Sequence, residues 1–385
     1  MTSQVKDRSL KVLGSLFGVL LFLVGGVQTA RGQQAQWEKE WERTIAAAKK
    51  EGKLVYHSGS TSEAFFRAFQ KKYPEIKAIR MLTRGGSAAA QRLMAERRAG
   101  LYASDVLVLG GTSGSMLATS GVLEPMEPNL ILPEILDRSK WLGGKHLYVG
   151  KLSGYLFVFA AIPRPFIGYN SDLVKSTDLK SYWDLLKPKW KGKIVSLDTS
   201  EARGGAGSSY RFLYYNPKIG PDLIRRLLGE MELTYSRDGR QITDWLATGK
   251  FALSVFTFPS RTGLHIAKEQ GLPVDWFPGQ HFKEGVPFSG GANNVAIVTR
   301  APHPNAAKLF VNWLLSREGQ ITAQKLGSSA GEGVESLRID IPKDDVPAAY
   351  RRKKGIDYFY TDKPEWMDMK PIAKLIKDVR RKQSR

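Results

Sequence analysis

Short apolar runs alternate with amphipathic stretches along the first third of the chain, and small polar residues separate them. "KLVYHS" (residues 53–58) has the apolar character of a buried strand, and "STSEAFFRAFQKKYP" (residues 60–74) has a helical period. The same order of strand, glycine or serine turn and helix returns over residues 76–100 and again over residues 104–121. Three such repeats predict βαβ units and a parallel sheet.

The helical repeat breaks at residues 147–174, a β-prone stretch with glycine and proline interruptions. This change predicts that the chain crosses there into another lobe. Helix and strand patterns resume over residues 181–260, and a strand-like stretch over residues 273–298 runs back. An amphipathic helix is then expected over residues 304–327, capped near Asn305.

We therefore expect an α/β protein with two lobes, because 385 residues exceed what one compact core usually holds. Each lobe would be based on a parallel sheet, and a two-strand hinge would join them at crossings near residues 163–168 and 286–290. The expected division is an export signal at residues 1–32, the first part of lobe 1 at 33–165, lobe 2 at 166–287, a return segment completing lobe 1 at 288–330, and a basic C-terminal segment wrapping the surface at 331–385.

The first 32 residues have the features of a secretory signal peptide. Basic residues precede an apolar run at residues 12–27, and the small residues of "ARG" (residues 30–32) precede the expected cleavage site after Gly32. The run is shorter than the roughly 20 residues that a membrane-spanning helix needs. We therefore expect the mature protein to be periplasmic.

Charge and cysteine content narrow the possible functions. The chain has no cysteine, which excludes disulfides, thiolate metal sites and a cysteine nucleophile. Its net charge is +21, and removal of residues 1–32 takes away four basic residues and one acidic residue, which leaves +21 − 4 + 1 = +18. This excess favours anionic partners, although solubility is an alternative explanation. The basic residues concentrate at the C-terminus, where we expect a solvated tail.

Small polar residues follow the expected strands, at the ends where helices begin. The carboxyl ends of parallel strands meet at one edge of a sheet, so these loops are expected to line one ligand site. Backbone N–H groups and helix N-termini suit an anion or a carboxylate, and Arg203 would add a bidentate partner. Ordinary capping, as by Ser60 and Ser87, is the alternative for any single loop. The candidate ligand-binding residues are His57, Ser58, Gly59, Ser60, Thr61, Gly86, Ser87, Gly111, Thr112, Ser200, Arg203, Gly204 and Gly205.

Sequence motifs give little support to an enzyme. The chain has no HExxH, no phosphate loop ending in GK[ST] and no GxGxxG after the first strand, and "GTSGS" (residues 111–115) misses GxSxG by its last residue. The histidines are isolated from one another, so we predict no metal site, no cofactor and no catalytic residue. An exported hydrolase or lyase that uses the same cleft remains an alternative. A basic protein that binds polyanions is another, but no recognition-helix motif indicates nucleic acid as a partner.

Several segments, in their order and spacing, resemble the type II periplasmic solute-binding proteins of ABC importers, in the iron(III)-binding-protein-like group. They are "AKKEGKLVYHSGS", "FFRAFQKKYPEIK", "SDVLVLGG", "SGVLEPMEP", "IGYNSDLV", "WDLLKPKWKGKIVSLD", "ITDWLATGKFALSV" and "GGANNVAIVTRAPHPNAAKLFVNWLLSREGQ", which span most of residues 45–325. The resemblance implies a two-lobed receptor without catalysis, which we expect to be a monomer. It would close on a small solute and deliver it to an inner-membrane ABC permease.

The resemblance does not settle the solute. Ferric-binding members carry adjacent tyrosines after the strand equivalent to "FALSVF", where this chain has "TFPSRTG" with Phe258 and Pro259. Tyr214 and Tyr215 do occur, but within an expected helix where core packing is the better interpretation. The anion-holding loop corresponds to "DTSEARGGAG". We therefore favour an anionic or carboxylated organic solute, with Phe256 or Phe258 packing on its apolar part, and keep ferric iron or an iron chelate as the alternative.

Overall fold

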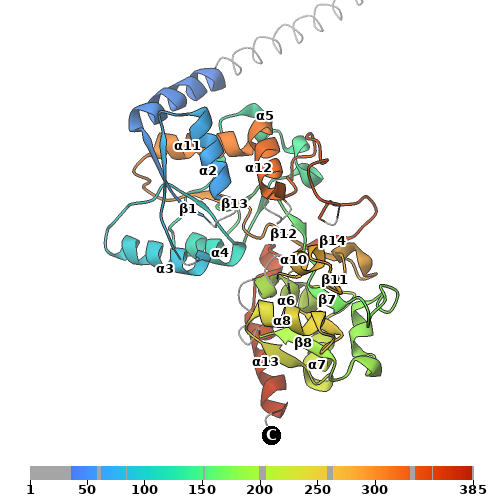
Figure 1. The fold of residues 1–385 in the computed structure, drawn as a ribbon. Coiled ribbons are helices and arrows are strands. Elements are labelled where there is room, and N and C mark those ends of the chain that lie inside the picture. Colours follow the sequence, from blue (N-terminus) through green and yellow to red (C-terminus); the bar gives the residue numbers. More distant parts are fainter. Residues whose placement is uncertain are drawn as a thin grey trace, which may run out of the picture.

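The computed structural model describes most of the chain (Figure 1). The described residues are 36–58, 62–83, 85–150, 152–198, 205–257, 263–329, 334–348 and 350–383. The expected signal peptide therefore lies outside them. So do seven of the candidate ligand-binding residues, namely Gly59, Ser60, Thr61, Ser200, Arg203, Gly204 and Phe258. Within the described residues, no helix is long and apolar enough to cross a membrane.

Lobe 1 is built on a mixed sheet. Its strands are β1 (Lys53–Ser58), β2 (Lys77–Arg80), β3 (Val106–Val108), β4 (Leu147–Tyr148), β5 (Phe157–Val158) and β13 (Asn294–Ile297). They form a six-stranded sheet in the order β2-β1-β3-β13-β5-β4, in which β1 pairs in parallel with β2 and β3. The predicted βαβ units are therefore present, and β13 adds an antiparallel strand against β3 and β5. The helices are one over residues 36–51, α2 (Glu63–Lys72), α3 (Gly85–Arg98), α4 (Gly111–Thr119), α5 (Pro133–Leu136), α11 (Pro304–Leu315) and α12 (Arg317–Ser329).

The core of lobe 1 joins segments that are far apart in sequence. In α2, Phe65, Phe66 and Phe69 form one buried face, as its helical period predicts. The Phe66 ring stacks on Tyr56 of β1 with centroids 3.5 Å apart, and on Phe310 of α11 with centroids 4.3 Å apart. Burial of such large rings supplies much of the stabilising free energy of a core. The return segment is thus part of the same hydrophobic core as the first strand.

The helix expected over residues 304–327 is two helices, α11 and α12. They are separated at Ser316, whose hydroxyl accepts a hydrogen bond from the Gly319 N–H at 3.1 Å and so caps α12. At the start of α11, the Glu51 carboxylate accepts the Asn305 N–H at 3.1 Å and its side-chain amide at 2.7 Å. The cap expected from Asn305 is therefore supplied by a distant carboxylate, which the helix dipole favours.

Lobe 2 has a second mixed sheet. Its strands are β7 (Ile167–Asn170), β8 (Ile194–Leu197), β9 (Thr234–Ser236), β10 (Leu253–Val255) and β11 (Val274–Trp276). They form a five-stranded sheet in the order β11-β7-β10-β8-β9, in which β8 is parallel to β9 and β10 and β7 is antiparallel to its neighbours. The helices are α6 (Gly205–Tyr215), α7 (Pro221–Glu230), α8 (Gly239–Ala247) and α10 (Leu264–Glu269).

Short 3-10 helices connect the larger elements. They are η1 (Glu127–Asn129), η2 (Arg138–Lys140), η3 (Leu142–Gly144), η4 (Tyr182–Leu186), η5 (Pro188–Trp190), η6 (Gly279–His281) and η7 (Pro364–Trp366). The helix expected from residue 181 forms as η4 and η5. Pro188 divides them, because proline lacks the N–H group and restricts the residue before it.

A three-stranded sheet lies between the two larger ones. It consists of β6 (Ile162–Pro163), β12 (Val286–Ser289) and β14 (Tyr358–Tyr360), in the order β14-β12-β6. The antiparallel pair of β6 and β12 lies at the two crossings that we expected from the sequence. The third strand, β14, pairs in parallel with β12 and was not expected. The lobes are therefore joined by three chain segments (Figure 1).

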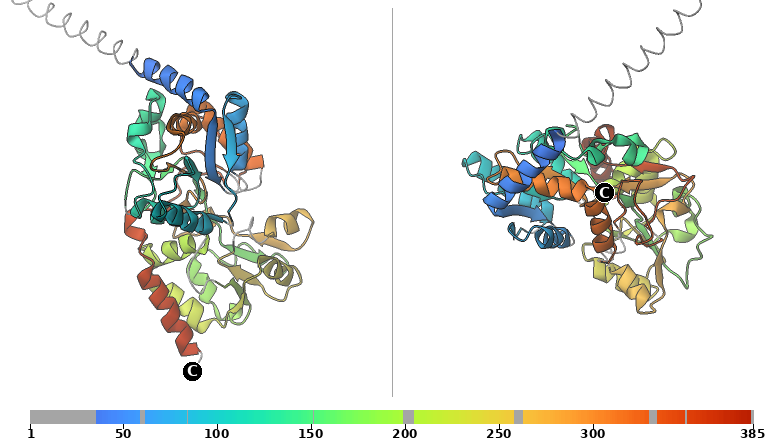
Figure 2. Two further views of the ribbon diagram at one scale, coloured as in Figure 1. Left: turned by 90° about the vertical axis from the view of Figure 1, so that its left-hand side faces the viewer. Right: turned by 90° about the horizontal axis from the view of Figure 1, so that it is seen from above.

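The C-terminal end of the chain is not the solvated tail that we expected. It ends in the helix α13 (Lys370–Gln383), whose residues Ile372, Ile376 and Val379 are buried in the core of lobe 2. Figure 2 shows α13 running along lobe 2 towards the C-terminus, and it contacts α7 along its length. The apolar residues recur at i, i+4 and i+7, so the sequence did contain a signal for this amphipathic helix.

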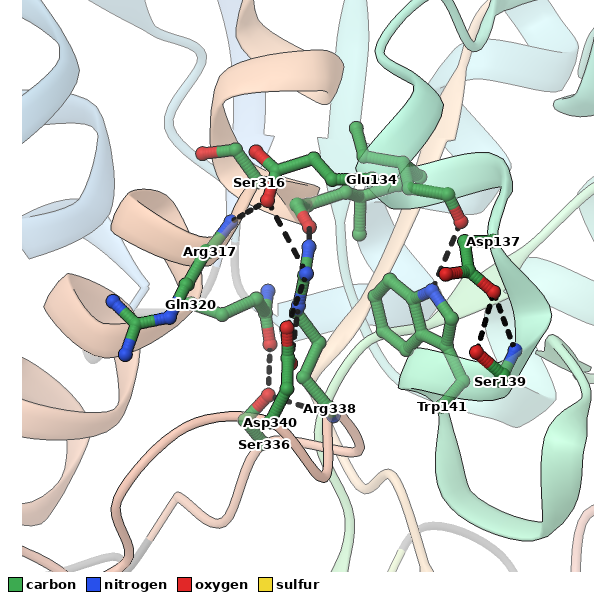
Figure 3. A network of polar contacts seen from close by, with 12 residues as sticks. Glu134, Asp137, Ser139, Trp141, Ser316, Arg317, Gln320, Ser336, Arg338 and Asp340 are labelled. Atoms are coloured by element: carbon green, nitrogen blue, oxygen red, sulfur yellow. Dashed lines mark hydrogen bonds and ion pairs between the residues drawn. The ribbon is translucent and has the colours of Figure 1, made fainter.

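The beginning of the C-terminal segment is anchored to lobe 1 (Figure 3). The side chain of Arg338 is 1% exposed, and its Nε and Nη2 donate to the two carboxylate oxygens of Asp340 at 2.9 and 2.8 Å. Nη2 also lies 3.2 Å from Glu134 of α5, and Nη1 donates to the Leu315 carbonyl of α11 at 3.3 Å. The segment thus starts fixed to lobe 1 and ends packed on lobe 2.

Candidate functional site

One edge of the lobe 1 sheet collects several of the candidate residues. β1 and β3 are parallel, and the register pairs Ser58 with Val108, so the two strands end side by side. The helices α3 and α4 begin at the same edge. A Cβ placed on Gly86 would lie 3.1 Å from the Ser113 hydroxyl, which shows how closely the two helix starts approach. The structure therefore brings together Ser58, Gly86 and Gly111, as parallel topology predicts.

The side chains at these helix starts differ in exposure. Ser87 and Thr112 are exposed, whereas Gly111 is buried. Both helices have at least nine residues, and their first N–H groups have no partner within the helix. These helix ends can donate to an anion or to a carboxylate oxygen.

The expected position of His57 was wrong. Its side chain is buried inside lobe 1, with 1% of the residue exposed, and its Nε2 lies 3.0 Å from the Ser104 hydroxyl. Burial, together with the nearby positive charge of Arg92, lowers the pKa of His57 to about 4. The ring is therefore neutral near pH 7 and takes part in the packing of the lobe. The reason is the period of β1, which turns His57 inward while Ser58 lies at the strand end.

Two glycines and one arginine extend this edge towards the hinge. A Cβ placed on Gly110 would lie 3.7 Å from the Gly291 carbonyl oxygen, so the segments before α4 and β13 are in contact. A Cβ on Gly291 would overlap the guanidinium of Arg164, which follows the hinge strand β6. Arg164 is half-buried, and its Nε donates to the Ser289 hydroxyl at 3.2 Å. A cation is thus held beside the segment that joins the hinge strand β12 to β13.

Sequence reasoning missed Arg164, Ser289 and Asn294. Arg164 and Ser289 lie beside or in the hinge strands β6 and β12, whereas Asn294 is the first residue of β13 in the lobe 1 sheet. Only the pairing of β6 with β12 and of β3 with β13 brings them to this edge. The adjacent glycines "GG" before Ala292 could have indicated that another segment approaches the backbone closely, but they do not identify that segment.

Two polar atoms at this edge have no hydrogen-bond partner among the described residues. They are the hydroxyl oxygen of Ser58 and the side-chain carbonyl oxygen of Asn294, and both are buried. The Asn294 amide donates to the Leu109 and Gly291 carbonyls, each at 2.9 Å, so its orientation leaves the oxygen as the open acceptor. Buried polar groups in proteins are usually satisfied, which makes such atoms indicators of a bound partner.

Of the lobe 2 candidates, the structure describes Gly205 and Phe256. Gly205 is the first residue of α6. Phe256, however, is fully buried and stacks on Tyr210 of α6 with ring centroids 4.1 Å apart. It therefore belongs to the core of lobe 2, and the expectation that it packs on a solute was wrong. The strand β10 leads Phe256 into the aromatic cluster that also contains Phe166.

The tyrosine pair belongs to the packing of the C-terminal segment. Tyr214 and Tyr215 are the last two residues of α6, and the Tyr215 hydroxyl donates to the Asp368 carbonyl at 2.6 Å. The Tyr215 ring also stacks on Trp366, with centroids 6.0 Å apart. In the described part of the chain, no group of three or more His, Cys, Asp or Glu residues could hold a metal ion. The described residues at the candidate edge thus offer hydrogen-bond donors and open acceptors. They also include the guanidinium groups of Arg164 and Arg80 and the Asp362 carboxylate, which lies beside Gly111.

A family model described as "Bacterial extracellular solute-binding protein" matches residues 56–321, more than half of the chain. A relative from Haemophilus influenzae, described as an uncharacterized protein, is 26% identical over 301 residues, which cover 74% of this chain and 78% of the relative.

Solved structures of periplasmic binding proteins share the fold at low sequence identity. The protein AfuA from Actinobacillus pleuropneumoniae, with fructose-6-phosphate bound, has a TM-score of 0.59 at 21% identity, over 84% of this chain and 96% of its own. The Trichodesmium protein IdiA (FutA), with iron and citrate, has a TM-score of 0.63 at 18% identity, over 85% and 99%. Iron-bound HitA from Pseudomonas aeruginosa has a TM-score of 0.55 at 20% identity, over 85% and 99%.

Proposed function

We propose that this chain, which belongs to the bacterial extracellular solute-binding protein family, captures a small anionic or carboxylated organic solute between its two lobes. It is a type II periplasmic solute-binding protein, the substrate-binding protein of an ABC transporter and not an enzyme. Its family is periplasmic or extracellular. The identity of the solute, the residues that hold it and the mode of delivery are parts of the proposal.

One observation carries the choice of solute class. The Arg164 guanidinium lies against Gly291, whose carbonyl oxygen approaches Gly110 immediately before α4. The N-terminal end of α4 favours negative charge through its N–H groups and the helix dipole. A carboxylate or phosphate could accept hydrogen bonds from both, and charge-assisted bonds of this kind are among the stronger ones. The open acceptor of Asn294 and the hydroxyl of Ser58 suit hydroxyl groups on the same solute.

Two relatives with this fold support an anionic solute. One was solved with fructose-6-phosphate and another with iron and citrate, so a phosphate ester and a carboxylate are both accommodated by the fold. Direct ferric binding by this chain is disfavoured, because Phe258 stands where ferric-binding members carry a tyrosine. We infer that any iron would be carried as an anionic chelate.

The proposed cycle is hinge closure. Lobe 1, at residues 33–165 and 288–330, would hold the solute through Ser58, Ser87 and Thr112. Lobe 2, at residues 166–287, would close on it with Arg203 and the start of α6. A solute that contacts both lobes stabilises the closed state by its differential affinity, and a monomeric receptor could then deliver it to the inner-membrane permease.

The test is a thermal-shift screen of residues 33–385 against organic acids, phosphate esters, amino acids, polyamines and ferric chelates. A solute at 100 times its dissociation constant adds about 2.7 kcal/mol of stability, which raises the melting temperature visibly. The variant Arg164→Gln should lose the shift, and the matched control Arg225→Gln on an exposed face of α7 should keep it. Selective binding of polyamines, or an unchanged shift in Arg164→Gln, would contradict the proposed solute class.

A further inference from the structure

The backbone of Asp362 is attached to both the hinge and lobe 1. This residue follows β14, and only 3% of it is exposed. The preceding Thr361 N–H donates to the Phe288 carbonyl of β12 at 2.9 Å. The Asp362 carbonyl accepts the Gly150 N–H, in lobe 1, at 3.1 Å. The position of this carboxylate is thus set by two segments that do not belong to lobe 2.

The side chain of Asp362 is held by lobe 2. Arg211, on α6, donates from Nη2 to an Asp362 carboxylate oxygen and from Nε to the Thr361 carbonyl at 2.8 Å. The Arg211 and Asp362 side chains are only 4% and 5% exposed. A pair this deeply buried is screened little by salt, and separating it would leave an uncompensated charge in the interior.

The same carboxylate also touches the candidate solute edge. A Cβ placed on Gly111, the first residue of α4, would lie 3.4 Å from the Asp362 carboxylate carbon. Glycine permits this close approach, and the N-terminal end of a helix favours a neighbouring negative charge. One side chain therefore contacts α4 of lobe 1 and is ion-paired to α6 of lobe 2.

We propose that the Arg211–Asp362 pair is an interlobe strut that sets the resting arrangement of the lobes and positions the start of α4 for the solute. The part concerning the solute rests on the proposed function. When one lobe moves relative to the other, either α4 and α6 move together or the Arg211–Asp362 ion pair separates. Because separation of the pair is disfavoured, the strut restricts the angles between the lobes that the unliganded protein can adopt. The distribution of these angles determines what fraction of the unliganded protein is competent to bind the solute.

An exposed ion pair in the same segment provides a matched control. Lys218, just after α6, lies 2.9 Å from Asp357, and these side chains are 48% and 67% exposed. This pair also links lobe 2 to the C-terminal segment, but exposed pairs contribute little to stability. Asp362→Asn and Asp357→Asn thus remove the same charge from neighbouring positions with different burial.

The experiment measures the distance between the lobes. Because the chain has no cysteine, nitroxide labels can be placed at Lys71→Cys on α2 and Arg240→Cys on α8, both exposed. Pulsed dipolar spectroscopy of residues 33–385 without solute should give a shifted or broadened distance distribution for Asp362→Asn and the wild-type distribution for Asp357→Asn. Identical distributions for wild type and folded Asp362→Asn would overturn the strut.

A double variant separates the ionic role from simple loss of folding. Arg211→Met with Asp362→Leu removes both charges, and such replacements of buried pairs often preserve stability. If the ion pair is the strut, the double variant should show the same altered distance distribution as Asp362→Asn. A wild-type distribution in the double variant would show that the packing of the two side chains, without their charges, holds the lobes, and would overturn the proposal.

Solute affinity tests the second half of the proposal. For a solute identified by the screen, Asp362→Asn should change the dissociation constant by about fivefold or more, the lower end of typical coupling between sites, and Asp357→Asn should not. Unchanged affinity beside altered distances would overturn the coupling to the solute site. The distance measurement needs no solute, so a blank screen would count against the proposed function and not against the strut.

Discussion

Replacement of Ile376 by alanine should destabilise lobe 2 although this residue lies nine positions from the C-terminus. Ile376 is 1% exposed and belongs to the core of lobe 2 together with residues of α7. Truncation of a fully buried isoleucine to alanine costs about 2–5 kcal/mol, because the lost transfer free energy is added to that of the cavity. We expect about 3 kcal/mol, since α13 covers the core from one side and its end can partly collapse into the cavity.

The assay is urea denaturation of residues 33–385, followed by tryptophan fluorescence. Trp366 is a useful reporter because it is buried in the same core as Ile376. The neighbouring Lys377 is exposed, so Lys377→Ala should change the free energy of unfolding by no more than about 0.5 kcal/mol. A loss below about 1 kcal/mol for Ile376→Ala, comparable with that control, would refute the packing of α13 and restore the solvated tail.

Four further predictions concern the solute and the folded state. Arg203→Ala should weaken solute binding more than tenfold without unfolding the protein, and a titration with unchanged affinity would remove Arg203 from the site. The pKa of His57 is lowered to about 4 in the folded protein, against about 6.5 in the unfolded chain. Between pH 4 and 6.5 the unfolded state therefore binds more protons than the folded state, so the free energy of unfolding falls as the pH is lowered from 6.5 to 4. His57→Gln should flatten that part of a stability profile measured against pH; an equally steep profile in the variant would assign the acid sensitivity to other groups. Asn312 is fully buried and its side chain bonds the Ile131 N–H at 2.7 Å and the Asn129 carbonyl at 2.8 Å, so Asn312→Ala should cost about 1–3 kcal/mol for each group left unpaired, which urea denaturation would detect. Addition of ferric salt should give no intense visible tyrosinate band, because Phe258 cannot supply a phenolate, and the appearance of such a band would reverse the choice of solute class.

The missed helix α13 and the missed hinge arginine differ in kind. The spacing of Ile372, Ile376 and Val379 is an ordinary helical period, so the amphipathic helix could have been predicted from the sequence. Arg164 carries no comparable signal. It is one basic residue among 58 in the chain, and its place beside Gly291 depends on strand pairing between distant segments.

The direction of individual side chains was the least predictable part of the site. His57 and Phe256 both stand at strand ends where a contact with solute was reasonable to expect. Their rings instead fill the interiors of the two lobes. A change of one residue in register turns a strand side chain to the other face, and a polar junction in the sequence does not determine which residue faces out.

Local sequence determined the elements and the class of this protein, because hydrophobic period and turn residues act over a few positions and repeat along the chain. The βαβ order, the two crossings and the resemblance to a binding-protein family all follow from such patterns. The tertiary structure decided which residues meet. Three chain segments rather than two join the lobes, and the Asp362 carboxylate comes to lie between Arg211 and Gly111, residues separated from it by 151 and 251 positions (362 − 211 and 362 − 111). Contacts over such separations arise only when the whole chain has folded, because their free energy depends on burial that no local segment can provide.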